Sequence, residues 1–281
     1  MNFIILFSPS EDKILEKDKI LNNDNFLKEV SMPEIMPPAF LESLWENEML
    51  NTHRTNIMQC YYENLCKILE HRDKALLESM YGAKGFNDKN IFDLYAALHS
   101  KKLLKAIELY SGVAFQGLSF STLTQSEKDF ILENVLIFSN LFGVIRASDL
   151  IPYYKLKQGT KTKPLTLKDI YTPFIPPLEK AMQTKDYAID LRAGIYTKLF
   201  KPKLPHFFFE FQKNGKTISH YAKLYRGKIL RLIAQAVCNQ SALESFEKCF
   251  EYLCSLHNTD FRFHSHTQKA NCFTLCYEIL S

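Results

Sequence analysis

Apolar residues recur along the chain with two different spacings, and these predict both strands and helices. Residues 3–7 (FIILF) form a short apolar run that stops at Ser8 and Pro9, which predicts a buried strand leading into a loop. Residues 14–32 are polar and rich in Asn, Lys and Asp, as expected of a surface loop. Over residues 38–109, apolar positions return every three or four residues, which predicts a mainly helical region.

A longer apolar run in the middle of the chain follows a helix start signal. Thr124 precedes Glu127 by three residues, a spacing typical of a capping box, in which each side chain bonds to the other residue's backbone. The run that follows, residues 130–141 (FILENVLIFSNL), is apolar on nearly every face. We therefore predict one helix without a polar face, lying at the centre of the core.

The C-terminal half alternates between strand and helix patterns. Residues 187–194 (YAIDLRAG) predict a strand that ends in a small-residue turn. Asn214 and Gly215 separate two β-favouring runs, and this pair supplies the positive φ angles of a tight hairpin turn. Residues 241–256 predict a helix, and residues 260–279 predict a final hairpin. These patterns predict a single α+β (mixed α/β) domain spanning the chain, with a central sheet and β-hairpins.

Two helices joined by a tight turn are predicted within residues 76–95 (LLESMYGAKGFNDKNIFDLY). Gly82 and Gly85 permit the turn, and the Asn-Asp pair after it can cap the second helix. We place this helical hairpin as an insertion over about residues 72–100 of the single domain. Its backbone N–H groups, beside Lys84, can hold a phosphate without reading a base sequence. An ordinary helical hairpin with solvated lysines fits the same residues.

Composition and charge narrow the class of protein without indicating a function. The 281 residues are 46% hydrophobic, enough for a full core, and the net charge of +4 permits an anionic partner without requiring one. The seven cysteines follow no disulfide framework, so we expect reduced thiols. The first apolar run stops at Phe7, and no stretch approaches the ~20 apolar residues of a membrane span. We therefore expect a soluble cytoplasmic protein.

One arginine is predicted on the apolar face of a late helix. On a helical projection of residues 220–237 (HYAKLYRGKILRLIAQAV), Arg226 falls inside the apolar arc. Three basic residues fall outside that arc and are predicted to be solvated: Lys223, Lys228 and Arg231. Because a guanidinium stays charged, Arg226 needs an anion. That anion is either a structural partner, such as Asp149 or Asp190, or a ligand.

Charged and aromatic groups follow directly on the central apolar run. Arg146 and Asp149 are three residues apart, a spacing at which they can form an ion pair on one helical turn. Tyr154 and Lys155 lie in a stretch where aromatic and basic residues alternate (YYKLK, residues 153–157). Such alternation suits a ligand that has phosphates and stackable rings, and it also suits a polar loop over the core.

Two other groupings have the residue types of a catalytic or metal site. Ser8 and Lys13 follow the first predicted strand and could act as nucleophile and base, but no G-x-S-x-G context accompanies them. The His-x-His pair at 264–266 and the Cys-x3-Cys pair at 272–276 match no standard zinc spacing. We expect no metal or other cofactor, and the residues assign no reaction.

Three well-separated segments share a distinctive combination of glycines, basic residues and an aspartate. They are FSPSEDK, LFGVIRASDLIPYYKLKQG and KNGKTISHYAKLYRG. In this order they resemble the patterns S-P-[AS]-K, G-V-[LI]-R-x-x-D-x-x-x-x-Y-[RK]-L-x-x-G and Y-A-K-x-x-R-G of the bacterial YaaA family, the peroxide stress proteins. The matching residues are Ser8, Pro9 and Lys13; Gly143, Arg146, Asp149, Tyr154, Leu156 and Gly159; and Tyr221, Lys223, Arg226 and Gly227.

The resemblance implies a single α/β domain with a basic cleft, a helix-hairpin-helix element at residues 83–88 (AKGFND) and binding of double-stranded DNA. It also implies a role in limiting oxidative damage, linked to lowered free iron. The chain departs from the family pattern where GVAFQG (112–117) replaces G-D-V-Y-x-G and where DLRAGIY (190–196) replaces N-L-A-S-x-E-Y. Both departures remove acidic groups, which a catalytic function could need and DNA binding does not.

We therefore expect a monomeric peroxide stress protein that binds double-stranded DNA through its phosphates, without sequence specificity. Asp149 is expected to hold Arg146 rigid. The alternative is an enzyme or binding protein for a small phosphorylated or purine-like molecule in the same cleft. Both hypotheses require the three segments to converge. The candidate DNA- or ligand-binding residues are Ser8, Lys13, Lys84, Gly85, Arg146, Asp149, Tyr154, Lys155, Lys223 and Arg226.

Overall fold

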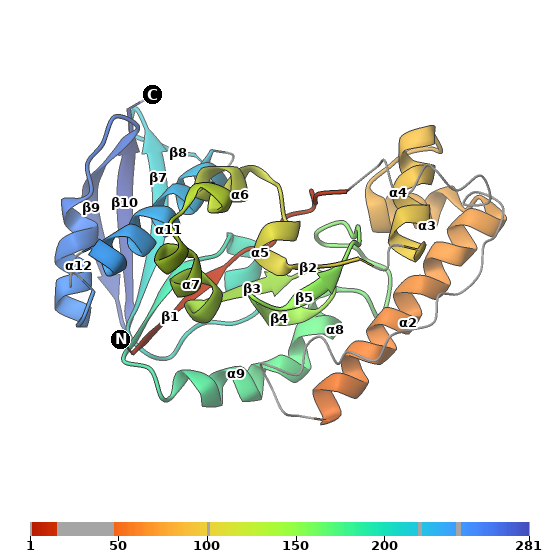
Figure 1. Cartoon of the computed structure of the whole chain (residues 1–281), viewed down its shortest axis with the longest axis horizontal. Coiled ribbons are helices and arrows are strands. Elements are labelled where there is room, and N and C mark those ends of the chain that lie inside the picture. Colours follow the sequence, from red (N-terminus) through yellow and green to blue (C-terminus); the bar gives the residue numbers. More distant parts are fainter. Residues whose placement is uncertain (1, 16–47, 100–101, 219–220, 240–242, 281) are drawn as a thin grey trace. The chain divides into compact units, whose positions relative to one another are not determined.

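A computed structural model describes residues 2–15, 48–99, 102–218, 221–239 and 243–280 (Figure 1). Its contacts divide the chain into two compact units, and each unit is assembled from separate stretches of sequence. Unit 1 comprises Met1–Ser8, Gly112–Phe138 and Pro176–Ser281, and unit 2 comprises Pro9–Ser111 and Ser139–Ile175. The mixed α/β class is confirmed, while a single domain over residues 1–281 stays a prediction.

The sheet of unit 1 is mixed, with a parallel centre. Within unit 1 the strands follow the order β3-β1-β6-β7-β10-β9, and β8 pairs with β7. Neighbours from β3 to β10 run parallel, whereas β9 and β8 run antiparallel to their partners. The strands are β1 (Phe3–Phe7), β3 (Val135–Ser139), β6 (Tyr187–Leu191), β7 (His206–Lys213), β8 (Lys216–Thr217), β9 (Phe261–Lys269) and β10 (Cys272–Ile279).

Several predicted strands and turns are confirmed in unit 1. All five residues of β1 are buried, as expected of a strand whose two faces are both covered. Asn214 and Gly215 have φ angles of 52° and 72° and close the predicted hairpin between β7 and β8. The final hairpin is the antiparallel pair β9 and β10.

The single helix predicted over the central apolar run is wrong. The capping box of Thr124 and Glu127 forms and starts α7 (Gln125–Asn134), but this helix ends before the apolar run is complete. The next residues, Val135–Ser139, form the fully buried strand β3, parallel to β1. A continuous apolar run fits a strand covered on both faces as well as a buried helix, so periodicity alone does not separate the two.

Helix α11 (Ala222–Asn239) packs closely on α6 (Val113–Leu118) through glycines. A Cβ built on Gly227 would lie 1.8 Å from the carbonyl oxygen of Ala114, and one on Gly117 would lie 2.3 Å from that of Leu224. The two backbones approach this closely because neither glycine has a side chain. The other helices of this unit are α9 (Ile175–Met182), α10 (Gly194–Thr197) and α12 (Phe246–Ser255), with a 3-10 turn at Phe120–Thr122.

Unit 2 is mainly helical, as the pattern over residues 38–109 predicts. Residues 38–47, and nearly all of the loop predicted at 14–32, lie outside the described residues. A small antiparallel sheet pairs β2 (Leu103–Lys105) with β5 (Leu150–Pro152). The other elements are α2 (Glu48–His71), α3 (Lys74–Tyr81), α4 (Asp88–His99), α5 (Ala106–Leu109), β4 (Gly143–Arg146), α8 (Leu167–Tyr171) and a 3-10 turn at Thr172–Phe174.

The predicted pair of helices with a tight turn is present as α3, a short loop and α4. Gly82 ends α3 in the left-handed conformation, with φ 72°, and its N–H bonds to the Glu78 carbonyl. The Asn87 side chain accepts the N–H of Asn90 and caps the start of α4. Throughout the described part of the chain, each helix is too short or too polar to span a lipid bilayer.

Candidate functional site: lysines and tyrosines of unit 2

Lys13 lies on two tyrosine rings in unit 2. Its Nζ is 3.9 Å from the ring centroid of Tyr154 and 5.1 Å from that of Tyr110. The same nitrogen donates hydrogen bonds to the carbonyl oxygens of Ser10 (3.0 Å) and Glu11 (3.2 Å). The chain before Lys13 thus turns so that two of its carbonyl groups face the Lys13 amine. A backbone β-bridge between Lys13 and Tyr110 fixes this segment beside α5.

The charged groups around Lys13 act on its pKa in opposite directions. Burial is the largest effect and lowers the pKa of Lys13 to about 7. The carboxylates of Glu11 and Asp12 raise this pKa, and the ammonium of Lys155 lowers it. The Glu11 carboxylate also accepts the backbone N–H of Gln158 at 2.6 Å.

Tyr154 belongs to a buried chain of hydroxyl groups. Its hydroxyl lies 2.7 Å from that of Tyr110 and 2.9 Å from that of Ser139. The Ser139 hydroxyl in turn accepts the backbone N–H groups of Leu141 and Phe142. Tyr154 is only 1% exposed, so its ring cannot stack on a base, as the alternating pattern suggested; instead it supports Lys13.

Lys155 is held by an acid that the sequence did not single out. Its Nζ lies 2.6 Å from a carboxylate oxygen of Asp93 on α4, and the hydroxyl of Tyr153 donates to the other oxygen at 3.4 Å. The backbone of Lys155 exchanges two hydrogen bonds with the hydroxyl of Tyr61 on α2. Lys155 therefore ties the segment after β5 to both helices.

Four exposed lysines gather at the C-terminal end of α3, and we call them the lysine surface: Lys84, Lys157, Lys161 and Lys163. The N–H of Lys157 donates to the Met80 carbonyl at 2.6 Å, and its side chain lies against Gly82. The loop that carries Lys161 and Lys163 is held to α3 by bonds from the Ser79 hydroxyl to Thr160 and Thr162. Exposed carboxylates also lie near this surface: Glu78 and Asp88 on the helical pair, and Glu11, which accepts the N–H of Gln158.

Gly85 lies in the α3–α4 loop beside this surface. A Cβ built on it would meet no atom of the described residues within 4 Å, so none of them crowds this position. Its carbonyl accepts a hydrogen bond from the Asn90 side chain. Lys84, its neighbour, is exposed, as a phosphate contact would need.

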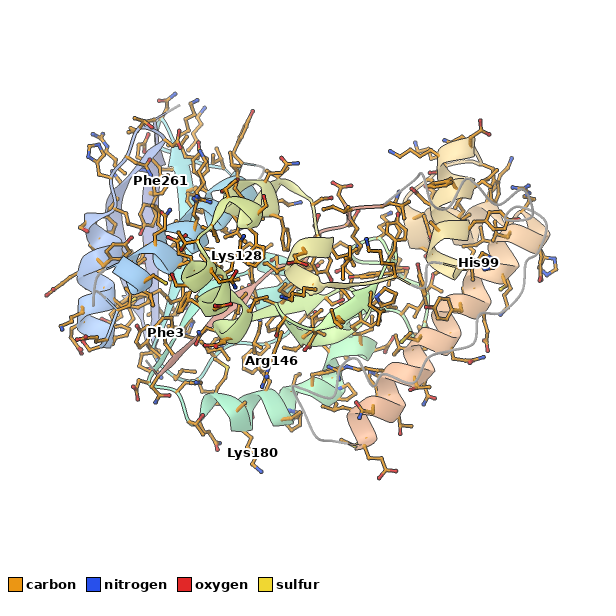
Figure 2. All side chains as sticks on the ribbon, viewed as in Figure 1. Phe3, His99, Lys128, Arg146, Lys180 and Phe261 are labelled. Carbon is orange, nitrogen blue, oxygen red and sulfur yellow. The ribbon has the colours of Figure 1, made fainter. Side chains whose placement is uncertain are left out.

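The ion pair on one helical turn that we considered for Arg146 and Asp149 is not what holds these residues. Arg146 ends the strand β4 (Figure 2), and the Asp149 carboxylate accepts its backbone N–H at 2.9 Å. Burial lowers the pKa of a second arginine, Arg54, and the Asp149 carboxylate raises it. Asp149 thus shapes the turn after β4 through the backbone of Arg146.

Arg54 on α2 is a buried charge that sequence reasoning missed. It is 1% exposed, and its Nε and Nη2 donate to the carbonyls of Phe142 (3.1 Å) and Val144 (3.0 Å). Its guanidinium lies 4.7 Å from the ring centroid of Phe174. Arg54 therefore fixes the strand that leads to Arg146. The signal available in the sequence was a basic residue at an apolar position of the α2 pattern.

Unit 1 contains a separate group of charges at the carboxyl ends of parallel strands. Arg192 binds Asp190 through Nε (2.8 Å) and Nη2 (2.6 Å), and these side chains are 0% and 2% exposed. The hydroxyl of Ser8, directly after β1, accepts the N–H of Ala193 at 2.8 Å. The carboxyl ends of parallel strands are where α/β proteins commonly bind ligands.

Arg226 lies on α11 of unit 1, and the helix continues through Gly227. Within the described part of the chain, its buried Nε has no hydrogen-bond partner. Burial lowers the pKa of Arg226, and the carboxylates of Asp190 and Glu210 raise it. Because Arg192 engages both oxygens of Asp190, that partner is already shared. An anionic ligand beside Arg226 would supply an acceptor for its Nε and balance the charge of the guanidinium.

The other basic residues of α11 differ in their surroundings. Lys223 is exposed, as predicted. Lys228 instead forms an ion pair with Asp260, and Arg231 donates to the carbonyls of Leu118 and Ser119. The prediction that Lys228 and Arg231 are solvated is therefore wrong. Helix α11 also contacts neighbouring segments through residues outside its apolar arc.

No group of three or more histidine, cysteine or acidic residues in the described ranges is arranged to hold a metal ion. Within the final hairpin, His266 pairs with Leu275, while Cys276 pairs with Ser265 and Cys272 with Lys269.

We expect the cysteine thiols to react slowly with peroxide. Burial raises the pKa of Cys60, Cys66, Cys254, Cys272 and Cys276, and that of Cys249 to about 12. A raised pKa leaves less of the reactive thiolate at neutral pH. We expect iodoacetamide at pH 7 to label the exposed Cys238 first, with labelling of the others accelerating as pH rises. Peptide mass spectrometry measures both the order of labelling and its dependence on pH. Rapid sulfenic acid formation at Cys249 at pH 7 would contradict the expectation.

The structure thus separates the candidate residues into two sets. Within unit 2, Lys13, Tyr154 and Lys155 lie close together, and Lys84 belongs to the lysine surface. Gly85, Arg146 and Asp149 are also in unit 2, while Ser8, Lys223 and Arg226 are in unit 1. Convergence of all three segments stays a prediction. Sequence reasoning missed Asp93, Tyr110, Lys161 and Lys163, since nothing in their local patterns marks them.

Comparison with known proteins places the chain in a family. The family model described as peroxide stress protein YaaA matches residues 3–254. An uncharacterised protein of Campylobacter jejuni is 34% identical over 232 residues, which cover 82% of this chain and 84% of the relative. A UPF0246 protein of Rickettsia conorii is 29% identical over 241 residues, covering 82% and 88%. With a family match over nearly the whole chain, this protein belongs to the YaaA family of peroxide stress proteins.

Proposed function

We propose that this chain is a cytoplasmic peroxide stress protein that binds double-stranded DNA through backbone phosphates, without sequence specificity. Binding would shield DNA from oxidative damage and would accompany lowered free iron. Membership of the peroxide stress family supports the stress role. The lysine surface is the observation that supports phosphate binding.

The lysine surface has the properties that a phosphate-binding site needs. Its four side chains are exposed, so a ligand in solution can reach them. They come from two loops that hydrogen bonds fix to α3, including the one from Lys157 to Met80. Lysine ammonium groups on a fixed backbone contact phosphates without reading bases. Duplex DNA presents such phosphates at regular intervals, so a surface of this kind suits it.

Lys155 has a different role in this proposal. Its ammonium is bound to Asp93 at 2.6 Å, so it positions α4 and is not counted as a phosphate contact. Arg146, Lys223 and Arg226 stay as further candidate contacts.

The proposal is tested by measuring duplex affinity by fluorescence anisotropy at several salt concentrations. Log affinity should fall linearly with log salt, by about 0.9 for each phosphate neutralised. Replacing Lys84, Lys157 and Lys161 together with alanine should lower affinity about tenfold or more at low salt and should reduce that slope. The matched control is Lys168→Ala, an exposed lysine of unit 2 on α8, which lies apart from α3 and α4 in Figure 1.

Two results would count against DNA binding by this surface. One is an affinity that does not depend on salt, and the other is an equal loss in the Lys168→Ala control. The alternative, a site for a small phosphorylated or purine-like molecule, is favoured by the unpartnered Nε of Arg226. Saturable binding of adenosine monophosphate that Arg226→Leu abolishes, without duplex binding, would favour that alternative.

A further inference from the structure

Arg226 of unit 1 is a cation whose buried Nε has no acceptor within the described residues. The ion pair at this end of the sheet joins Arg192 to Asp190 and uses both carboxylate oxygens. Glu210, the other acid that acts on Arg226, is exposed, so solvent screens its charge. A buried donor without an acceptor costs free energy, and a ligand that supplies an acceptor would recover it.

Packing contacts place Arg226 near the carboxyl ends of β1 and β6. Its neighbour Gly227 packs closely on α6. The ring of Phe115 on α6 lies edge-on to that of Phe7, the last residue of β1, with 5.3 Å between the centroids. Asp190, which acts on the charge of Arg226, lies one residue before the end of β6.

This end of the sheet is also a topological switch point. Strands β1 and β6 are parallel neighbours. The chain that leaves β1 next enters this sheet at β3, on one side of the pair, and the chain that leaves β6 enters β7, on the other side. Open α/β sheets commonly bind ligands where two such connections diverge.

The segments that follow β1 and β6 meet at the switch point. The hydroxyl oxygen of Ser8 accepts the N–H of Ala193 at 2.8 Å, which leaves the hydroxyl hydrogen of Ser8 to donate. Gly194 is exposed, and a Cβ built on it would meet no atom of the described residues within 4 Å. Ser8 and Arg226 therefore both offer hydrogen-bond donors at this end of the sheet.

These groups indicate the chemistry of a ligand. Donors select a group that only accepts, and the rings of Phe7 and Phe115 are buried, so neither can stack on a base. A guanidinium and a hydroxyl that come from different elements suit a phosphate monoester, whose terminal oxygens accept from several directions. We propose that unit 1 binds a small phosphate monoester at the switch point of β1 and β6, with Arg226 and Ser8 donating to the phosphate.

This inference goes beyond the DNA-binding proposal, because the lysine surface belongs to unit 2 and the switch point to unit 1. It also deepens the alternative function, on which it rests in part: it assigns recognition to the phosphate group of the small molecule and not to a purine. The ligand is bound reversibly, and no covalent step is involved.

Isothermal titration calorimetry of the full-length protein with ribose 5-phosphate tests the proposal. We expect saturable binding, and binding at least about tenfold weaker for ribose, which lacks the phosphate. Arg226→Met should weaken binding about tenfold or more, because charge-assisted hydrogen bonds are lost. Arg226→Lys keeps the charge without the planar fork, so its affinity should lie between the two. Ser8→Ala should weaken binding about threefold.

Controls separate ligand binding from a structural role. Lys248→Met removes an exposed lysine on α12 of the same unit and should leave the affinity for ribose 5-phosphate unchanged. Arg226→Met should not lower the free energy of unfolding in urea, because it replaces a buried charge that has no close ion pair. No binding of ribose 5-phosphate by the natural chain, or equal affinity in Arg226→Met, would overturn the inference.

Two further arms identify the site and the ligand group. The variant with alanine at Lys84, Lys157 and Lys161 should bind ribose 5-phosphate as the natural chain does, and loss of binding there would overturn the assignment to unit 1. Galacturonate carries a carboxylate on a sugar, and equal or tighter binding of it would overturn the assignment of a phosphate. If duplex DNA does not bind while ribose 5-phosphate does, the DNA-binding proposal fails and this inference stands.

Discussion

Replacing Gly227 with alanine should lower the free energy of unfolding by about 3 kcal/mol. The added Cβ would stand 1.8 Å from the carbonyl oxygen of Ala114 and 2.9 Å from the backbone nitrogen of Leu118. Both are main-chain atoms of the α6 region, so no side chain can rotate away to make room. The two helices would have to separate and lose apolar contact. Urea unfolding followed by circular dichroism measures the loss.

The matched control for this change is Gly194→Ala in the same unit. A Cβ at Gly194 meets no atom within 4 Å, and the residue begins the short helix α10. Alanine there should be neutral or should stabilise by up to about 1 kcal/mol, because it restricts the unfolded chain. Equal losses in the two variants would show that the close contact of α6 and α11 is not what requires Gly227.

Replacing Asp190 with asparagine should cost about 3–5 kcal/mol. The change leaves the guanidinium of Arg192 buried with only neutral acceptors, namely the carbonyls of Tyr196 and Phe200 and the one amide oxygen left at position 190. A buried charge that loses its partner is far more costly than the pair is stabilising. Because removing both charges relieves that cost, Asp190→Asn combined with Arg192→Met should recover part of the loss. The measurement is again the free energy of unfolding in urea.

A surface pair provides the comparison for Asp190→Asn. Lys248 and Glu244 form an i,i+4 ion pair on unit 1 with side chains 54% and 53% exposed. Glu244→Gln should cost only about 0.3–0.5 kcal/mol, since solvent screens the pair. A similar small cost for Asp190→Asn would mean that water reaches Arg192, contrary to its complete burial in the fold.

Local patterns were sufficient for most of the backbone. The buried strand β1, the Asn214–Gly215 turn, the capping box of α7 and the α3–α4 pair each depend on residues within a few positions of one another. Such features are decided by φ preferences, caps and apolar spacing, all of which are visible in sequence. The change from helix α7 to strand β3 was not visible in the sequence, because an apolar run suits a buried helix and a buried strand equally.

For the candidate site, the sequence by itself determined the chemical types: the motif lysines and arginines, the adjacent tyrosines, and the resemblance that the family match confirms. Only the tertiary structure decided their partners. It brings Asp93 to Lys155 across 62 positions and Arg54 to Phe142 across 88, and it brings Tyr110 to Tyr154 to form the wall on which Lys13 lies. The spacing of residues in the sequence relates only side chains on the same helix or strand. The burial and charge environment of a side chain depend on the distant residues that the fold places beside it.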